Sequence, residues 1–151
     1  MTKASKAYIA AQAIWGFPQT VLGAAVLLRY AGRPHFRFHG AVVTTWESRK
    51  ALSLGPFIFI GGSSDHLETR ASVDERLLVH EYGHTVQSLA LGPLYLLVVG
   101  LPSVIWLNLP FLSRMRKRRG LSYYAFYTER SANALGERVT GKPSVGLAHI
   151  D

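Results

Sequence analysis

The chain has 151 residues, a formal net charge of +8 and no cysteine. This length allows one domain, spanning residues 1–151, with a real hydrophobic core, but not two. Without cysteine, disulfides and thiolate-bound zinc are excluded, so any bound metal must be held by His, Asp or Glu. Charged residues make up 17% of the chain, below the roughly 25% typical of soluble domains. The positive balance indicates anionic partners such as phospholipid surfaces, nucleic acid or acidic proteins.

The first apolar segment, residues 8–28, carries no charged side chain and is long enough to cross a bilayer. Basic residues flank it on both sides, so we expect it to associate with a membrane. A secretory signal peptide fits less well, because Gly16-Phe17-Pro18 interrupts its middle. The alternative is a buried or interfacial pair of helices broken at Pro18.

Residues 34–63 are rich in β-branched and aromatic residues and are punctuated by glycine. This composition predicts short strands, at about 36–46 and 53–60. His35 and His39 lie at the start of the first of these strand regions and are expected to be structural. A helix is then predicted from about Ser72, with Ser72 as its N-cap and Glu75 as the partner of a capping box.

That helix contains the motif HExxH, formed by His80, Glu81 and His84 in the segment LLVHEYGHTVQS. Positions four apart lie one above the other on a helix, so the two imidazoles can hold one metal ion. Glu81 lies one step round the helix, within reach of a water on that ion, and can act as the catalytic base. Gly83 is a poor helix former, and its presence indicates close approach of another backbone or a ligand.

A catalytic zinc site needs a third protein ligand, and Glu129 is the best candidate. It lies in a second predicted helix, residues 123–139, where Ala132 and Gly136 would keep one face thin enough to pack against the first helix. Asn133, one turn after Glu129, could hydrogen-bond a ligand histidine. Glu129 could instead be a solvated helix carboxylate. The weaker alternative ligands are His66, His149 and Asp65.

HEYGH followed later by TExxAN resembles the gluzincin group of zinc metallopeptidases. It is also similar to small bacterial metallopeptidase-like proteins with HEYGH, then GPLYL and GxPS, then TExxAN, some of which form the C-terminal regions of Rhs-type toxins. The matching stretches here are residues 80–88, 92–103 and 128–133. The resemblance implies an α+β, zincin-like fold in which the edge strand of a small sheet presents a peptide beside the active helix. Asn133 stands where many gluzincins have Asp, so its hydrogen bond would be neutral.

The second apolar segment, residues 89–112, is also uncharged and precedes the basic cluster 114–119. A single membrane crossing would leave His84 and Glu129 near opposite faces, where they could not share an ion. The turn signal at 100–103 predicts a broken helical hairpin. As a helix, residues 89–99 would be only about 16 Å long, and neither arm is long enough to cross about 30 Å of hydrocarbon. We expect it to dip into the membrane or to pack in the core, with the basic cluster and the site on the cytoplasmic side.

These features favour a zinc-dependent peptidase acting on peptide or protein, with an anionic membrane as a further partner. Tyr123, Tyr124 or Tyr127 could donate a hydrogen bond to the oxyanion of the reaction. The alternative is a non-catalytic module that uses zinc for stability and binds a membrane or a partner. Nucleic-acid binding is disfavoured, because the basic cluster lacks interleaved aromatic residues and a recognisable binding module. The last ten residues, 142–151, are expected to form a loosely held tail.

Overall fold

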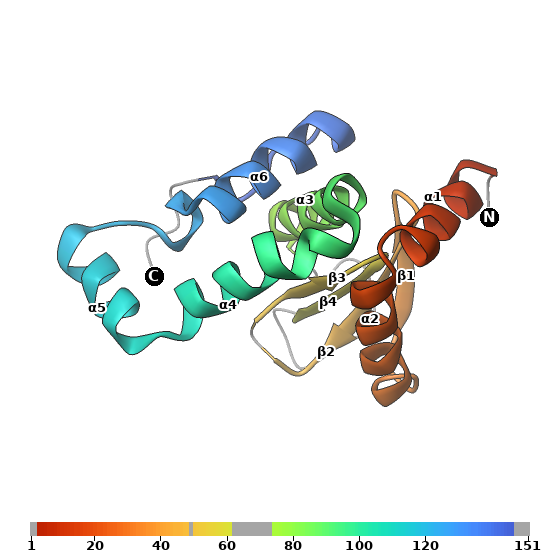
Figure 1. The fold of residues 1–151 in the computed structure, drawn as a ribbon, viewed down its shortest axis with the longest axis horizontal. Coiled ribbons are helices and arrows are strands. Elements are labelled where there is room, and N and C mark those ends of the chain that lie inside the picture. Colours follow the sequence, from red (N-terminus) through yellow and green to blue (C-terminus); the bar gives the residue numbers. More distant parts are fainter. Residues whose placement is uncertain (1–2, 49, 62–73, 147–151) are drawn as a thin grey trace.

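The computed structural model describes residues 3–48, 50–61 and 74–146. Over these residues the chain forms a mixed α+β fold, which confirms the predicted class (Figure 1). One four-stranded sheet contains β1 (His35–Phe38), β2 (Ala41–Trp46), β3 (Leu52–Leu54) and β4 (Phe57–Gly61). The helices are α1 (Lys3–Ile14), α2 (Phe17–Arg29), α3 (Glu75–Leu91), α4 (Leu101–Asn108), α5 (Pro110–Arg119) and α6 (Tyr127–Thr140), with short turns η2 (Gly92–Leu94), η3 (Leu96–Gly100) and η4 (Tyr123–Ala125).

The sheet has the order β1-β2-β4-β3, in which β2 and β4 are parallel and the two outer pairs are antiparallel. Strands are confirmed in both ranges expected for them, 36–46 and 53–60, but each range is a hairpin of two short strands instead of one continuous strand. The first hairpin turns at His39 and Gly40, which both have positive φ, as a type I′ turn requires. The second turns at Gly55 (φ 59°) and Pro56 and leaves β3 at the edge of the sheet.

Helix α3 covers the sheet and supplies much of the core. Leu78, Val79 and Tyr82 pack against buried side chains of β1, β2 and β4, such as Val43 and Ile58. The helix begins at Glu75, and its N-cap is Asp74, whose carboxylate accepts hydrogen bonds from the backbone N–H groups of residues 76 and 77. The expected start at Ser72 is therefore wrong, and Ser72 itself lies outside the described residues. An aspartate is as good a cap as a serine, and it stands directly before the first helical turn.

Both apolar segments are bent helix pairs. Within the described ranges no single helix is long and apolar enough to cross a membrane, whereas two pairs pass that test together but are bent by 112° and 118°. The first bend separates α1 from α2 close to Pro18, as one of the alternatives predicts. The second bend lies between residues 94 and 96, so the break expected at 100–103 is wrong. Pro102 is accommodated there because it stands in the first turn of α4, directly after a π-helical turn.

The C-terminal part differs from expectation in two ways. Residues 123–125 form the separate turn η4, and extended backbone at Phe126 (φ −66°, ψ 148°) divides it from α6, so the continuous helix expected over 123–139 is wrong. Ser144 is buried, and its N–H and Oγ donate to the Glu137 carboxylate at 3.0 and 2.7 Å. Residues 142–146 are thus held against α6 and are not a loose tail, while 147–151 lie outside the described residues.

Candidate metal centre

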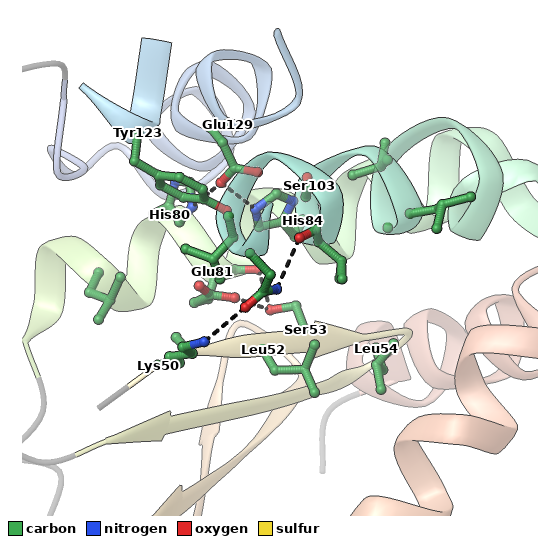
Figure 2. A pocket seen from close by; sticks show the side chains of 18 of the residues that line it. Lys50, Leu52, Ser53, Leu54, His80, Glu81, His84, Ser103, Tyr123 and Glu129 are labelled. Atoms are coloured by element: carbon green, nitrogen blue, oxygen red, sulfur yellow. Dashed lines mark hydrogen bonds and ion pairs between the residues drawn. The ribbon is translucent and has the colours of Figure 1, made fainter. Parts of the chain in front are cut away.

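His80 and His84 on α3 face Glu129 on α6, and all three side chains are buried (Figure 2). Their Nε2 atoms lie 3.2 and 3.3 Å from the same oxygen, Glu129 Oε2. One ligand atom from each residue falls within 4.8 Å of the others, a spacing suited to one metal ion. The structure thus brings together the three residues that the sequence predicts as ligands.

Hydrogen bonds fix both imidazole rings in the orientation that a metal requires. His80 Nδ1 donates to Asn133 Oδ1 at 2.8 Å, and His84 Nδ1 donates to Gln87 Oε1 at 2.7 Å. With Nδ1 protonated, a neutral imidazole presents an unprotonated Nε2, which is the atom that binds metal. Asn133 therefore occupies the role expected for it. Gln87 was missed in the sequence, although its position three residues after His84 on the same helix places it within reach.

The glutamate is oriented as firmly as the histidines. Its second oxygen, Oε1, accepts a hydrogen bond of 3.0 Å from Thr128 Oγ1, which in turn accepts one of 2.8 Å from Ser103 on α4. Oε2 is left to face the two imidazoles. Because Ser103 comes from the second apolar segment, that segment supports the site directly.

Close packing of α3 on α6 makes the three-residue cluster possible. A Cβ atom added at Gly83 would lie 1.9 Å from Ala132 O, and one added at Gly136 would lie 2.1 Å from Val79 O. Real Cβ contacts are essentially never below 3.0 Å, so the two backbones can approach this closely only at glycine. The close approach expected from Gly83 and the thin helix face expected from Ala132 and Gly136 are both confirmed.

The charges of the cluster are strongly coupled. Burial alone would lower the pKa of His84, but the adjacent Glu129 carboxylate raises it to about 9. Burial would raise the pKa of Glu129, but His84 and His80 together hold it far below its usual range. An ionised glutamate between two imidazoles is a site for a positive charge, which is carried either by a proton or by a metal cation.

Glu81 lies on the same helix but outside the cluster of three. Its Oε2 accepts a hydrogen bond of 2.7 Å from Ser53 Oγ on the edge strand β3, and its side chain is buried. Ser53 Oγ also lies 2.9 Å from the backbone carbonyl of Glu81. The serine therefore ties the carboxylate to the edge of the sheet. Ser53 lies 28 residues before Glu81, and no spacing rule in the sequence points to it.

A cavity of about 720 Å³ opens beside these residues. It is lined by His80, Glu81, His84 and Glu129, by β3, and by mostly apolar residues of η3 and α4 (Figure 2). Two polar residues of the lining, Lys50 and Asn108, are joined by a hydrogen bond of 3.1 Å from Lys50 Nζ to Asn108 Oδ1. A cavity of this size lies within the usual range of ligand-binding pockets, about 300–1,000 Å³.

Three tyrosines line the cavity, and only two of them were expected. Tyr123 and Tyr124 belong to the lining, and the Tyr124 ring lies edge-on to His80 with centroids 4.9 Å apart. Burial and then the charge of Glu129 raise the pKa of Tyr123, so its hydroxyl stays protonated. Tyr95, the third, donates to Ser53 O at 3.3 Å. Tyr127 does not line the cavity; it is half exposed and donates to Val98 O at 2.7 Å.

The remaining candidate residues lie either apart from the cluster or outside the described residues. His66, Asp65 and His149 lie outside the described residues. His35 hydrogen-bonds Thr44 Oγ1 at 2.9 Å, and the His39 ring packs against Phe38 and Tyr82. Both histidines thus have structural partners in or beside the sheet, as the sequence predicts.

Comparison with known proteins adds no relative: no protein-family model, no curated protein and no solved structure matches the chain. The function is therefore argued from the chemistry of the site alone. That site combines three convergent ligand atoms, a nearby carboxylate outside the ligand set, protonated tyrosine hydroxyls and a largely apolar cavity.

Proposed function

We propose that the chain is a zinc-dependent peptidase in which His80, His84 and Glu129 hold the ion. Tetrahedral zinc with bonds of about 2.0–2.1 Å would place neighbouring ligand atoms about 3.3 Å apart. Glu129 Oε2 already lies 3.2 and 3.3 Å from the two imidazole nitrogens. The donor set of two histidines and one glutamate is typical of catalytic zinc, which keeps one position open. This convergence of ligand atoms is the observation that carries the proposal.

Zinc bound there would supply Lewis acidity and lower the pKa of a water molecule toward neutrality. Glu81 is the proposed base, because its carboxylate lies beside the ligands without joining them and is held by Ser53. It would take the proton from the attacking water and deliver it to the leaving amine. Tyr123 or Tyr124 would donate a hydrogen bond to the oxygen of the scissile carbonyl. Tyr123 is protonated at neutral pH and lines the same cavity.

A zincin-like arrangement is the corresponding proposal for the fold. β3 is an edge strand, and its three residues line the cavity next to the HExxH helix. Extended peptides bind to such edges by adding a strand, with backbone hydrogen bonds supplying affinity and pockets supplying specificity. Peptide or protein is therefore the proposed substrate class.

The proposed setting is an anionic membrane surface, with the site on the cytoplasmic side. The strongly basic α5 supports this orientation, since clusters of Lys and Arg stay on the cytoplasmic face. Nucleic acid is not a proposed partner. The non-catalytic zinc module remains the competing proposal, and it differs in one respect: it has no need of the Glu81 carboxylate.

The test is to measure bound zinc and cleavage of a quenched-fluorescent peptide library by the zinc-loaded protein. His80→Ala and Glu129→Ala should lose tight zinc, whereas Glu81→Gln should keep zinc and lose cleavage by orders of magnitude. Glu75→Gln, at the exposed start of the same helix, is the matched control and should behave as wild type. Cleavage by Glu81→Gln at the wild-type rate would exclude the peptidase mechanism, and tight zinc in Glu129→Ala would exclude the ligand set.

A further inference from the structure

The two bent apolar segments, far apart in the sequence, meet at their bends. Gly92, where α3 ends, has φ 55°, and a Cβ there would lie 2.4 Å from the ring of Trp15, which stands at the bend between α1 and α2. Gln19 on α2 adds hydrogen bonds of 2.9 Å from its side-chain nitrogen to Gly92 O and to Ser88 Oγ. The bend between α1 and α2 therefore packs directly against the end of α3, close to the second bend.

From this joint, exposed apolar side chains continue through every element as far as α5. Trp15 is 55% exposed, Leu97 66% and Phe111 71%. We name these exposed apolar side chains together the docking surface. Its exposed apolar members are Ile14, Trp15, Phe17, Val21, Leu22, Leu28, Leu94, Leu97, Val98, Leu101, Val104, Ile105, Leu109 and Phe111. Soluble proteins rarely expose so many large apolar side chains in adjoining elements without a partner.

The charged residues of the elements that carry this surface are all basic. No Asp or Glu occurs in residues 1–46 or 82–128, so all the elements that carry the docking surface are free of acidic residues. The basic residues Arg114, Lys117, Arg118 and Arg119 directly follow Phe111 on α5, and all four are exposed. Apolar side chains beside exposed cations match the chemistry of an anionic bilayer, in which acyl chains lie beneath negative headgroups.

We propose that the docking surface binds an anionic lipid bilayer, with its apolar side chains in the headgroup–acyl boundary and α5 on the phosphates. Neither bent pair crosses the bilayer in this arrangement, which agrees with bends of 112° and 118°. An interfacial position of this kind needs an apolar face and a basic flank but no spanning helix. Apolar side chains from both bent segments would contact the lipid, so a charged substitution in either segment should weaken binding.

The docking surface also borders the cavity. Leu101 and Val104 of α4 are half exposed and also line the cavity. Helix α4 would therefore lie between the cavity and the proposed bilayer. If the chain is the peptidase proposed above, its substrates are peptides held at or emerging from the lipid surface. This consequence rests on the proposed peptidase activity, whereas lipid binding does not, and the two can fail separately.

The test uses the purified full-length protein and flotation with vesicles of phosphatidylcholine alone or mixed with phosphatidylglycerol. Wild type should float with the mixed vesicles and much less with the neutral ones. Leu97→Glu and Phe111→Glu should each weaken binding about tenfold or more, because each puts a charge where an apolar side chain would contact the acyl chains. Val139→Glu replaces a similarly exposed residue on α6 and is the matched control, expected to float as wild type.

A second pair of variants tests the charges. Arg118→Gln with Arg119→Gln should weaken binding to the mixed vesicles by about tenfold or more. Arg130→Gln with Arg138→Gln, which removes two exposed cations from α6, should not. Lipids with brominated acyl chains should quench tryptophan emission, and the quenched share should fall in Trp15→Phe, which retains Trp46 and Trp106.

Three outcomes would overturn the proposal. One is no flotation of wild type with either vesicle. Another is equal weakening by Val139→Glu and Leu97→Glu. The third is a stable dimer that Leu97→Glu dissociates while wild type ignores lipid, because the surface would then be an interface between two copies of the chain.

Discussion

Replacing Gly136 by alanine tests whether the contact between α3 and α6 sets the geometry of the His80–His84–Glu129 cluster. The added methyl would lie 2.1 Å from Val79 O, whereas ordinary van der Waals contact begins at 3.4 Å. The helices must therefore separate by about 1.3 Å, and the obstructing atom is backbone, which cannot rotate away. Overpacking costs about 1–3 kcal/mol, and we place this case at the upper end. Alanine regains about 1 kcal/mol of helix propensity, so the net loss of unfolding free energy should be about 2 kcal/mol.

The assay is thermal unfolding together with zinc affinity measured against a competing chelator. A loss of about 2 kcal/mol lowers the melting temperature by about 4–8 °C for a chain of this size. Zinc affinity should fall too, because Glu129 moves with α6 and metal bonds tolerate only about 0.2 Å. Gly100→Ala is the matched control: its nearest neighbour, Leu96 Cδ2, would lie 3.5 Å away, so it should be neutral or stabilising. If Gly136→Ala is as stable as wild type and binds zinc equally, the helix contact does not set the ligand geometry.

The remaining predictions concern the orientation of ligands, the oxyanion donor and pH. Gln87→Ala removes the acceptor of His84 Nδ1 and should lower zinc affinity about 10–100-fold in a chelator competition, with His84 still present. Tyr123→Phe should lower peptide cleavage, whereas Tyr127→Phe, whose hydroxyl bonds Val98 O outside the cavity, should leave it unchanged; equal rates for both variants would exclude Tyr123 as the donor. In the metal-free protein, the raised pKa of His84 stabilises the fold fully below its unfolded value of 6.5, and this stability is lost as pH rises through about 9. The lowered pKa of Glu129 has the opposite sign, so its contribution is lost as pH falls below about 4.5. Urea unfolding at a series of pH values measures both, and a stability that is flat from pH 6 to about 9 would contradict the His84–Glu129 ion pair.

The sequence predicted those parts of the fold that follow a helical period. The i, i+4 spacing of His80 and His84, and the face that Glu129 shares with Asn133, are local properties of single helices. Gly83 and Gly136 indicated close approach because glycine weakens a helix and is retained only for a compensating reason. These signals require no knowledge of which distant segments meet.

Features that depend on distant segments could not be predicted in this way. Ser53 holds Glu81 only because β3 is folded back as an edge strand, and the turn at Gly55 that makes this possible falls inside the range where the sequence predicts a strand, 53–60. Pro102 is a strong break signal in the second apolar segment, but a π-helical turn allows the helix to continue there, and the bend lies between residues 94 and 96, just after Gly92. Gly92 is required there by the ring of Trp15, which lies in a different segment.

The hydrogen bonds of the site explain why a change in the contact between α3 and α6 should also disturb the His80–His84–Glu129 cluster. Gln87 belongs to α3, and its side-chain nitrogen donates to Thr128 O at 2.8 Å and to Ser131 Oγ at 2.6 Å on α6. Asn133 belongs to α6 and accepts from His80 on α3. Each histidine of the cluster is therefore oriented by an amide that also joins the two helices. Separating α3 from α6 would misplace Glu129 and loosen both imidazoles at once, so the effects of variants at this interface on zinc affinity should not be additive.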